Sequence, residues 1–335
     1  MITKTIKRAL LNTLAASSWG KELIWNLGRD YHAGGTLDDA LATANTLFSE
    51  RGMQSTLDVL GEQATTEQQA AVYRTTYLAA ITRIDDEDQA DRISISLKPT
   101  AICAVNSDGT QLLDEESLQE NLEDIVRYAE ERGIRVTLDM EDHHWTHVSL
   151  EAAQHIWHQG YSNFGIVLQS RLHRTREDIE RIFQNGQYTT EKRDMRVRAC
   201  IGIYEEEKEI AYDRKTAKKE LVKRIGELFD AGVFVEIATH DRRVIDEVRE
   251  LIAQKGIPKE RYEFQFLKGV QGAYDLASQL REEEITTRCY VPFELKKGDG
   301  VPYMVRRLVN NNRFLWYAAK NKGLQLARVF YRRKA

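Results

Sequence analysis

The segments RISISLK at residues 92–98 and RVTLD at residues 135–139 decide the fold of this chain. Each is a short β-rich run that ends in a charged residue, and the pattern of residues 114–132 between them is typical of an amphipathic helix. A strand, a helix and a second strand at this spacing predict a parallel βαβ unit.

The same alternation recurs along the rest of the chain. Further helical patterns cover residues 175–183, 217–231 and 242–253. Together these units predict an α/β fold, a (β/α)₈ barrel of the TIM type. A doubly wound open sheet would normally carry a G-x-G-x-x-G string, and the sequence has neither that string nor a Walker A string. The predicted strands cover residues 55–60, 92–97, 135–138, 164–168, 196–201, 233–238, 262–267 and 288–292.

The first part of the chain is expected to stand apart from the barrel. Residues 1–51 show helical patterns, with Thr36 as a helix cap ahead of Leu37. No Gly/Ser-rich linker follows, and a length of 335 residues suits one barrel. We therefore predict an N-terminal helical arm over residues 1–51, a barrel over residues 52–335, and a helix after the last strand that covers the barrel mouth.

The composition excludes several classes of protein. A net charge of −4 with 42% hydrophobic residues allows a large core and gives no bias toward nucleic acid, so no nucleic-acid partner is expected. Cys103, Cys200 and Cys289 lack the spacing of a disulfide framework or a zinc knuckle. The N-terminus lacks a secretory core, and no apolar run reaches membrane-spanning length. We expect a cytoplasmic protein, with the basic and aromatic residues 326–334 as the candidate for peripheral membrane contact.

Polar side chains end or interrupt six of the predicted strands. In a barrel of parallel strands the active site forms at the carboxyl ends of the strands, so we expect these side chains to meet at one mouth. They are Lys98, Asp139, Gln169, Thr239, His240, Gln265 and Tyr290.

Two adjacent arginines follow the last predicted strand. Arg306 and Arg307 lie in a helix that begins near Pro302, and an arginine pair on a helix is usually exposed to solvent. After the eighth strand of a barrel, however, the helix is expected to overhang the mouth. There the two guanidinium groups could hold a carboxylate by paired hydrogen bonds.

Taken in order, these motifs resemble the flavin-dependent proline dehydrogenases. The resemblance implies that residues 52–335 form a distorted, flavin-binding (β/α)₈ barrel that holds FAD at its mouth. It implies oxidation of L-proline to 1-pyrroline-5-carboxylate by hydride transfer to flavin N5. It also implies a quinone-type acceptor for the electrons. The motifs that carry it are LDVLGE at 57–62, SLK at 96–98, LDME at 138–141, VLQ at 167–169, ATHD at 238–241, YEFQ at 262–265, YVP at 290–292 and YMVRRL at 303–308.

The resemblance also implies roles for individual residues. Arg306 and Arg307 would grip the substrate carboxylate, Lys98 would add positive charge, Asp139 would orient Lys98, and aromatic side chains would wall the substrate ring. The implied catalytic residues are Lys98, Asp139, Tyr290, Tyr303, Arg306 and Arg307. The implied FAD-binding residues are Met140, Gln169, Arg198, Gly202, Thr239, His240 and Gln265.

Three positions near the implied substrate pocket depart from the family pattern. The fifth strand of the family runs roughly Arg-Leu-Val-Lys-Gly-Ala-Tyr, and this chain has Ile201 in place of the lysine and Ile203 in place of the alanine. Asn310 replaces a glutamate after the arginine pair. Ile203, Leu267 and Asn310 are therefore the pocket residues that bear on specificity. Proline, another cyclic amino acid and a biosynthetic substrate all remain open.

A second class of function rests on histidines. His143 and His147 lie four residues apart, so they could share a helix face and bind a divalent ion. Such a pair would suit a metal-dependent barrel hydrolase. The resemblance implies no metal, and loop or surface histidines are the more common outcome of this pattern.

Overall fold

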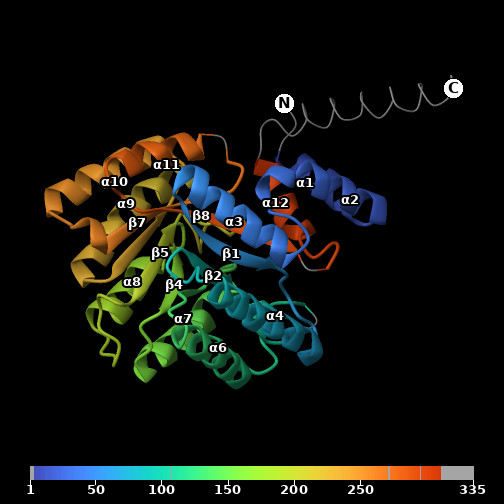
Figure 1. Cartoon of the computed structure of the whole chain (residues 1–335), viewed down its shortest axis with the longest axis horizontal. Helices are drawn as coiled ribbons and strands as arrows, with labels where there is room; N and C mark the ends of the chain where they lie inside the picture. Colours follow the sequence, from blue (N-terminus) through green and yellow to red (C-terminus); the bar gives the residue numbers. More distant parts are fainter. Residues whose placement is uncertain (1–3, 107, 271, 295, 311–335) are drawn as a thin grey trace.

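The structure is a computed structural model that describes residues 4–106, 108–270, 272–294 and 296–310. Eight parallel strands form a closed barrel in which each strand pairs with the next along the chain and β1 pairs with β8 (Figure 1). The predicted (β/α)₈ barrel is therefore confirmed, and each predicted strand overlaps an observed one. The strands are β1 Gln54–Leu60, β2 Ile93–Leu97, β3 Val136–Leu138, β4 Phe164–Gln169, β5 Arg196–Cys200, β6 Phe234–Ala238, β7 Tyr262–Leu267 and β8 Thr287–Glu294.

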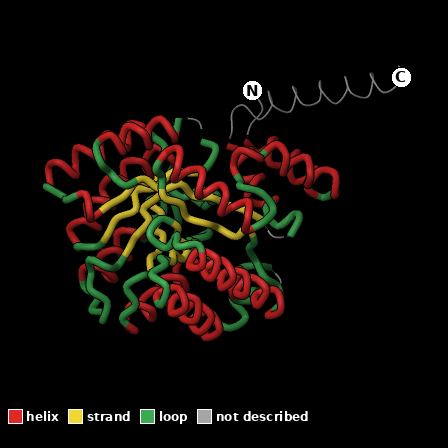
Figure 2. Tube along the Cα trace, in the orientation of Figure 1, coloured by secondary structure: helices red, strands yellow, loops and turns green. Residues whose placement is uncertain are grey.

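Helices surround the strands on the outside of the barrel (Figure 2). Most begin at a side chain that accepts a backbone N–H of the first turn, as Asp213 and Asp241 do, and several end at a left-handed glycine such as Gly232. These helices are α4 Glu67–Asp86, α5 Pro99–Ile102, α6 Glu115–Glu130, α7 His143–Gln159, α8 Thr175–Ile179, α9 Arg214–Ala231, α10 Arg242–Lys255 and α11 Ala273–Glu282. Shorter helical segments cover Arg29–Tyr31, Glu180–Gln184 and Lys259–Arg261.

The helices before β1 divide between two neighbours. α3, Leu37–Arg51, contacts β1 and β8, whereas α1, Lys4–Ala15, and α2, Ser18–Leu27, contact α12, Val301–Asn310 (Figure 1). Leu11 and Ile24 share an apolar cluster with α12. The division of the chain after residue 51 stays a prediction, because α3 packs on the barrel itself. The stretch 326–334 lies outside the described residues, and no helix in the described part is long and apolar enough to cross a membrane.

Below its mouth the barrel is filled with buried polar side chains. Arg196 Nε donates to Glu236 (2.9 Å), Arg288 Nε donates to Glu263 (2.6 Å), and Gln265 donates to both glutamates. Arg288 on β8 also reaches the hydroxyl of Ser94 on β2. Contacts between strands that are not neighbours run through the barrel interior. We call this group the barrel network: Arg196, Arg198, Glu236, Glu263, Gln265 and Arg288.

Candidate active site

A buried lysine stands at the end of β2. Lys98 is 6% exposed, and its Nζ donates to Oδ1 of Asp58 on β1 at 2.7 Å. Burial by itself would lower the pKa of Lys98, but the carboxylates of Asp58 and Asp139 and the nearby Tyr77 raise it well above its ordinary value, so the amine stays cationic. The implied hydrogen-bonding partner of Lys98 was Asp139, and the structure corrects this to Asp58.

Asp139, directly after β3, joins three other strands. Its Oδ1 accepts from Ser96 Oγ (2.7 Å) and from Arg198 Nη1 (2.5 Å), and its Oδ2 accepts from the hydroxyl of Tyr290 on β8. Burial and the neighbouring Asp139 both raise the pKa of Tyr290 well above its ordinary value. The Tyr290 hydroxyl therefore stays protonated and locked against the carboxylate.

Arg198 and Gln169 each have one buried polar atom without a hydrogen-bond partner within the described chain, Nη2 and Oε1 respectively. Arg198 Nε donates to Gln265 (2.6 Å), and Gln169 Nε2 donates to the carbonyl of Glu141 (2.6 Å). Gly202, at φ 97°, packs against Gln169, since a Cβ there would come within 2.2 Å of Gln169 Oε1. A buried donor and a buried acceptor without protein partners suit a polar, hydrogen-bonding ligand.

His240 lies at the same edge of the barrel, after β6. Its Nε2 accepts the backbone N–H of Leu267 at 2.7 Å, so the neutral ring carries its proton on Nδ1. Burial and the charge of Arg307 lower the pKa of His240 to about 4. Thr239 accepts the N–H of Asp241 (3.3 Å), and Met140 is packed in the core.

The low pKa of His240 predicts acid sensitivity. Between pH 6.5 and 4 the unfolded chain protonates this histidine and the folded chain does not, so its contribution to stability is complete above pH 6.5 and is lost as pH falls toward 4. His240→Gln keeps an acceptor for the Leu267 N–H without titrating. We expect the free energy of unfolding of the unmodified protein to fall by on the order of 2 kcal/mol more than that of the variant. Urea unfolding at pH 7 and pH 4 measures this, and parallel curves would contradict it.

The two arginines of α12 differ in their surroundings. Arg306 makes paired hydrogen bonds to both carboxylate oxygens of Glu62, at 2.7 and 2.8 Å, and its guanidinium lies 5.5 Å from the ring of Tyr204. Arg307 Nε is buried and has no hydrogen-bond partner among the described residues, and its guanidinium lies 4.8 Å from the ring of Tyr303. The predicted pair is therefore split into one arginine that holds a protein carboxylate and one whose Nε remains available.

Sequence reasoning missed four side chains at this mouth. Asp58 and Glu62 lie within the LDVLGE motif, and Glu141 lies within LDME, so the motifs contained them without assigning them a role. Glu141 is buried and accepts from Thr100 Oγ1 (2.9 Å); burial and the nearby Glu62 raise its pKa to about 8. The fourth, Tyr204, ends the motif that departs from the family pattern.

The structure describes the side chains of two of the three predicted pocket residues. Leu267 ends β7, Ile203 follows β5 in the loop before α9, and both are partly exposed. Asn310 is the last residue of α12, and its side chain lies outside the described part of the structure. Gln265 belongs to the barrel network: its Oε1 accepts from Arg198 and its Nε2 donates inward. The predicted role of Gln265 in an FAD site stays a prediction, and the structure places its side chain against Arg198, Glu236 and Glu263.

The two histidines of the predicted metal-binding pair, His143 and His147, contact different carboxylates. His147 is exposed and forms an ion pair with Glu151 one turn along α7 (3.2 Å), whereas the ring of His143 contacts Glu206 (2.6 Å). His143 instead groups with Asp142 and His144. The ligand pair assumed for a hydrolase is absent from the described structure.

Fold and site together define a class of protein. It is a (β/α)₈ barrel protein whose mouth carries the buried cation Lys98 and polar side-chain atoms that have no protein partner in the described structure.

Comparison with known proteins identifies the family. The proline dehydrogenase family model matches residues 40–315, so the chain belongs to the proline dehydrogenase family and is an oxidoreductase of that type. The proline dehydrogenase of Deinococcus radiodurans is 27% identical over 321 residues, which are 93% of this chain and 96% of that protein. Proline dehydrogenase 1 of Bacillus subtilis subsp. natto is 30% identical over 283 residues, covering 84% and 85% of the two chains.

A solved structure supports the fold independently. Proline utilization A of Bdellovibrio bacteriovorus, in a form inactivated by N-propargylglycine, superposes with a TM-score of 0.75 at 22% identity over 87% of this chain. This chain spans 33% of that larger protein. The resemblance seen in the sequence is confirmed, and family membership argues against the hydrolase alternative.

Proposed function

We propose that this protein oxidises L-proline to 1-pyrroline-5-carboxylate with FAD as its cofactor and passes the electrons to a quinone-type acceptor. The observation that supports the proposal is the set of groups at the mouth: the buried cation Lys98, Arg307 with its unpartnered Nε, and the unpartnered donor and acceptor of Arg198 and Gln169. The curated relatives named proline dehydrogenase support the choice of proline.

FAD would be held by the residues around Arg198 and Gln169 at the barrel mouth. When bound it accepts a hydride, which is chemistry that no amino-acid side chain supplies. Arg198 Nη2 and the His240 Nδ1–H would be donors for it, and Gln169 Oε1 would be an acceptor, with Gly202 packed against Gln169. Met140 and Thr239 complete the proposed set, and Gln265 holds Arg198 in place from below.

The substrate would be oriented by charge and by aromatic walls. Arg307 has an unpartnered Nε that would meet the carboxylate, Lys98 would add a second positive charge, and Tyr290 and Tyr303 would pack against the ring. Cations around a bound amino acid favour the neutral amine over the ammonium form. The nitrogen lone pair is then available as the C–H bond next to nitrogen breaks and the C=N bond forms.

The alternative substrate is another cyclic amino acid. The reason to consider it is the size of Ile203. An isoleucine in place of a small residue costs about 1 to 3 kcal/mol wherever a ligand needs the space, which corresponds to roughly 10- to 100-fold in relative affinity. The same enzyme chemistry would then operate on a ring of different shape.

A flavin absorbance measurement tests both candidates. We expect the purified full-length protein, reconstituted with FAD, to show oxidised flavin bands that bleach anaerobically on addition of L-proline. D-proline is the matched control and should leave the bands unchanged. Bleaching by L-pipecolate or L-azetidine-2-carboxylate but not by L-proline would favour the alternative, and failure to bind FAD would overturn the proposal.

We propose the cytoplasm or the cytoplasmic membrane surface as the site of action. A quinone acceptor would be reached at that surface. Reoxidation of the proline-reduced protein by a soluble quinone, with and without phospholipid vesicles, tests the acceptor and the membrane contact separately.

A further inference from the structure

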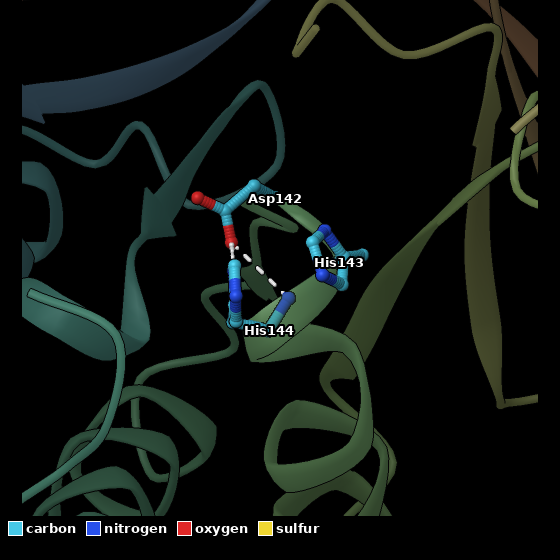
Figure 3. A group of neighbouring side chains, drawn as sticks. All are labelled: Asp142, His143 and His144. Carbon is cyan, nitrogen blue, oxygen red and sulfur yellow. Dashed lines mark hydrogen bonds and ion pairs between the residues drawn. The ribbon is translucent and has the colours of Figure 1, made fainter. Parts of the chain in front are cut away.

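A cluster of metal-ligating side chains lies outside the residues assigned to substrate and FAD. Asp142 is the N-cap of α7, and His143 and His144 are the first two residues of that helix. One ligand atom from each of the three lies within 4.8 Å of the others (Figure 3). His144 Nδ1 is 3.1 Å from Asp142 Oδ1, and the two imidazole ring centroids are 3.9 Å apart.

A fourth residue reaches the cluster from another loop. Glu206, between β5 and α9, has a side chain that is only 3% exposed. Its Oε1 accepts the backbone N–H of His143 (3.0 Å), and its Oε2 lies 2.6 Å from His143 Nδ1. A carboxylate on one ring nitrogen fixes the proton there and leaves the other nitrogen, Nε2, with a lone pair. Metal-binding histidines are commonly oriented in this way.

The types of ligand select a class of ion. Two imidazoles and one carboxylate suit borderline transition metals such as Zn²⁺, whereas Ca²⁺ and Mg²⁺ prefer oxygen ligands alone. Three protein ligands would leave a coordination position for water. The cluster differs from the predicted His143 and His147 pair, because His147 is exposed and held by Glu151.

We propose that Asp142, His143 and His144 bind one divalent ion of the Zn²⁺ class, with Glu206 orienting His143. The site lies in the segment after β3, and the contact of Glu206 with His143 ties it to the loop after β5 at the rim of the barrel. The first loop begins with Asp139, and the second contains Tyr204, which packs on Arg306. The ion would therefore stabilise the loops that surround the mouth, and it would take no part in hydride transfer.

Zn²⁺ titration of the chelator-treated, full-length protein tests the site. We expect one Zn²⁺ per chain with a dissociation constant of 10 µM or tighter, on the order expected for a partly formed three-ligand site. Asp142→Asn keeps a good helix cap and removes the charge, and His144→Ala removes an exposed ring; each should weaken binding at least tenfold. Glu206→Gln should weaken it by roughly 10- to 100-fold, as loss of an orienting carboxylate does.

His147→Ala is the matched control, because it removes a histidine from the same helix outside the cluster. It should bind Zn²⁺ as the unmodified protein does. Absence of one-to-one binding, or equal weakening by His147→Ala and His144→Ala, would overturn the proposal. Co²⁺ absorbance gives a second readout of histidine ligation, and neither measurement depends on FAD or proline.

Discussion

We expect Lys98→Met to reduce proline oxidation strongly and also to destabilise the barrel, and we expect the addition of Asp58→Asn to restore only the stability. In the single variant the carboxylate of Asp58, 0% exposed, loses the amine that compensates it. Loss of one partner from a buried ion pair costs about 3 to 5 kcal/mol. The double variant has no uncompensated charge, so most of this loss is recovered.

Activity should not recover with stability, because the substrate still lacks the cation. We expect kcat/KM for L-proline to fall by roughly 100-fold or more in both variants, the scale of losing one fixed electrostatic contact at a reacting centre. Urea unfolding measures the first effect, and anaerobic flavin reduction rates measure the second. A double variant with near-normal activity would assign Lys98 to the structure of the barrel alone.

Arg307→Met raises the KM for L-proline far more than that for L-prolinamide. The substrate carboxylate would be left desolvated without its proposed partner, which costs about 2 to 5 kcal/mol, or roughly 30- to 5,000-fold in kcat/KM. The amide carries no charge at that position and should lose little. Steady-state kinetics on the two substrates measures the difference.

Arg306 provides the matched comparison on the same helix. Glu62 already accepts paired hydrogen bonds from Arg306 at 2.7 and 2.8 Å. Arg306→Met would leave the Glu62 carboxylate without its cationic partner, so we expect this variant to lose folding stability as well. Equal losses on acid and amide in the Arg307 variant would show that Arg307 does not bind the carboxylate.

The barrel could be predicted from the sequence because each strand and helix leaves a local pattern. The strands that end at Lys98 and Asp139 can be recognised from short runs of β-forming residues, and the helix between them from its own apolar spacing. The rule that active sites form at carboxyl ends then brought both residues to one mouth. Neither step requires knowledge of contacts between distant parts of the chain.

Pairings across the barrel could not be predicted in the same way. Lys98 had two carboxylates within plausible reach, and only the register of β1 against β2 puts Asp58 in contact with it. Arg306 and Arg307 are equivalent as letters, but successive residues on a helix point about 100° apart, so one meets Glu62 and the other does not. Strand alternation predicts that Gln265 points inward but does not give its depth below the mouth.

The barrel network bears on how the protein responds to temperature. Exposing apolar surface raises the heat capacity of the chain by about 0.45 cal/mol/K per Å², whereas exposing polar surface lowers it by about 0.26. Arginines, glutamates and a glutamine occupy interior positions that in most such barrels hold branched aliphatic side chains. Unfolding therefore produces a smaller increase in heat capacity than it would for an aliphatic barrel of equal length. The curve of stability against temperature is correspondingly flatter, and the barrel loses less of its stability for each degree away from its optimum.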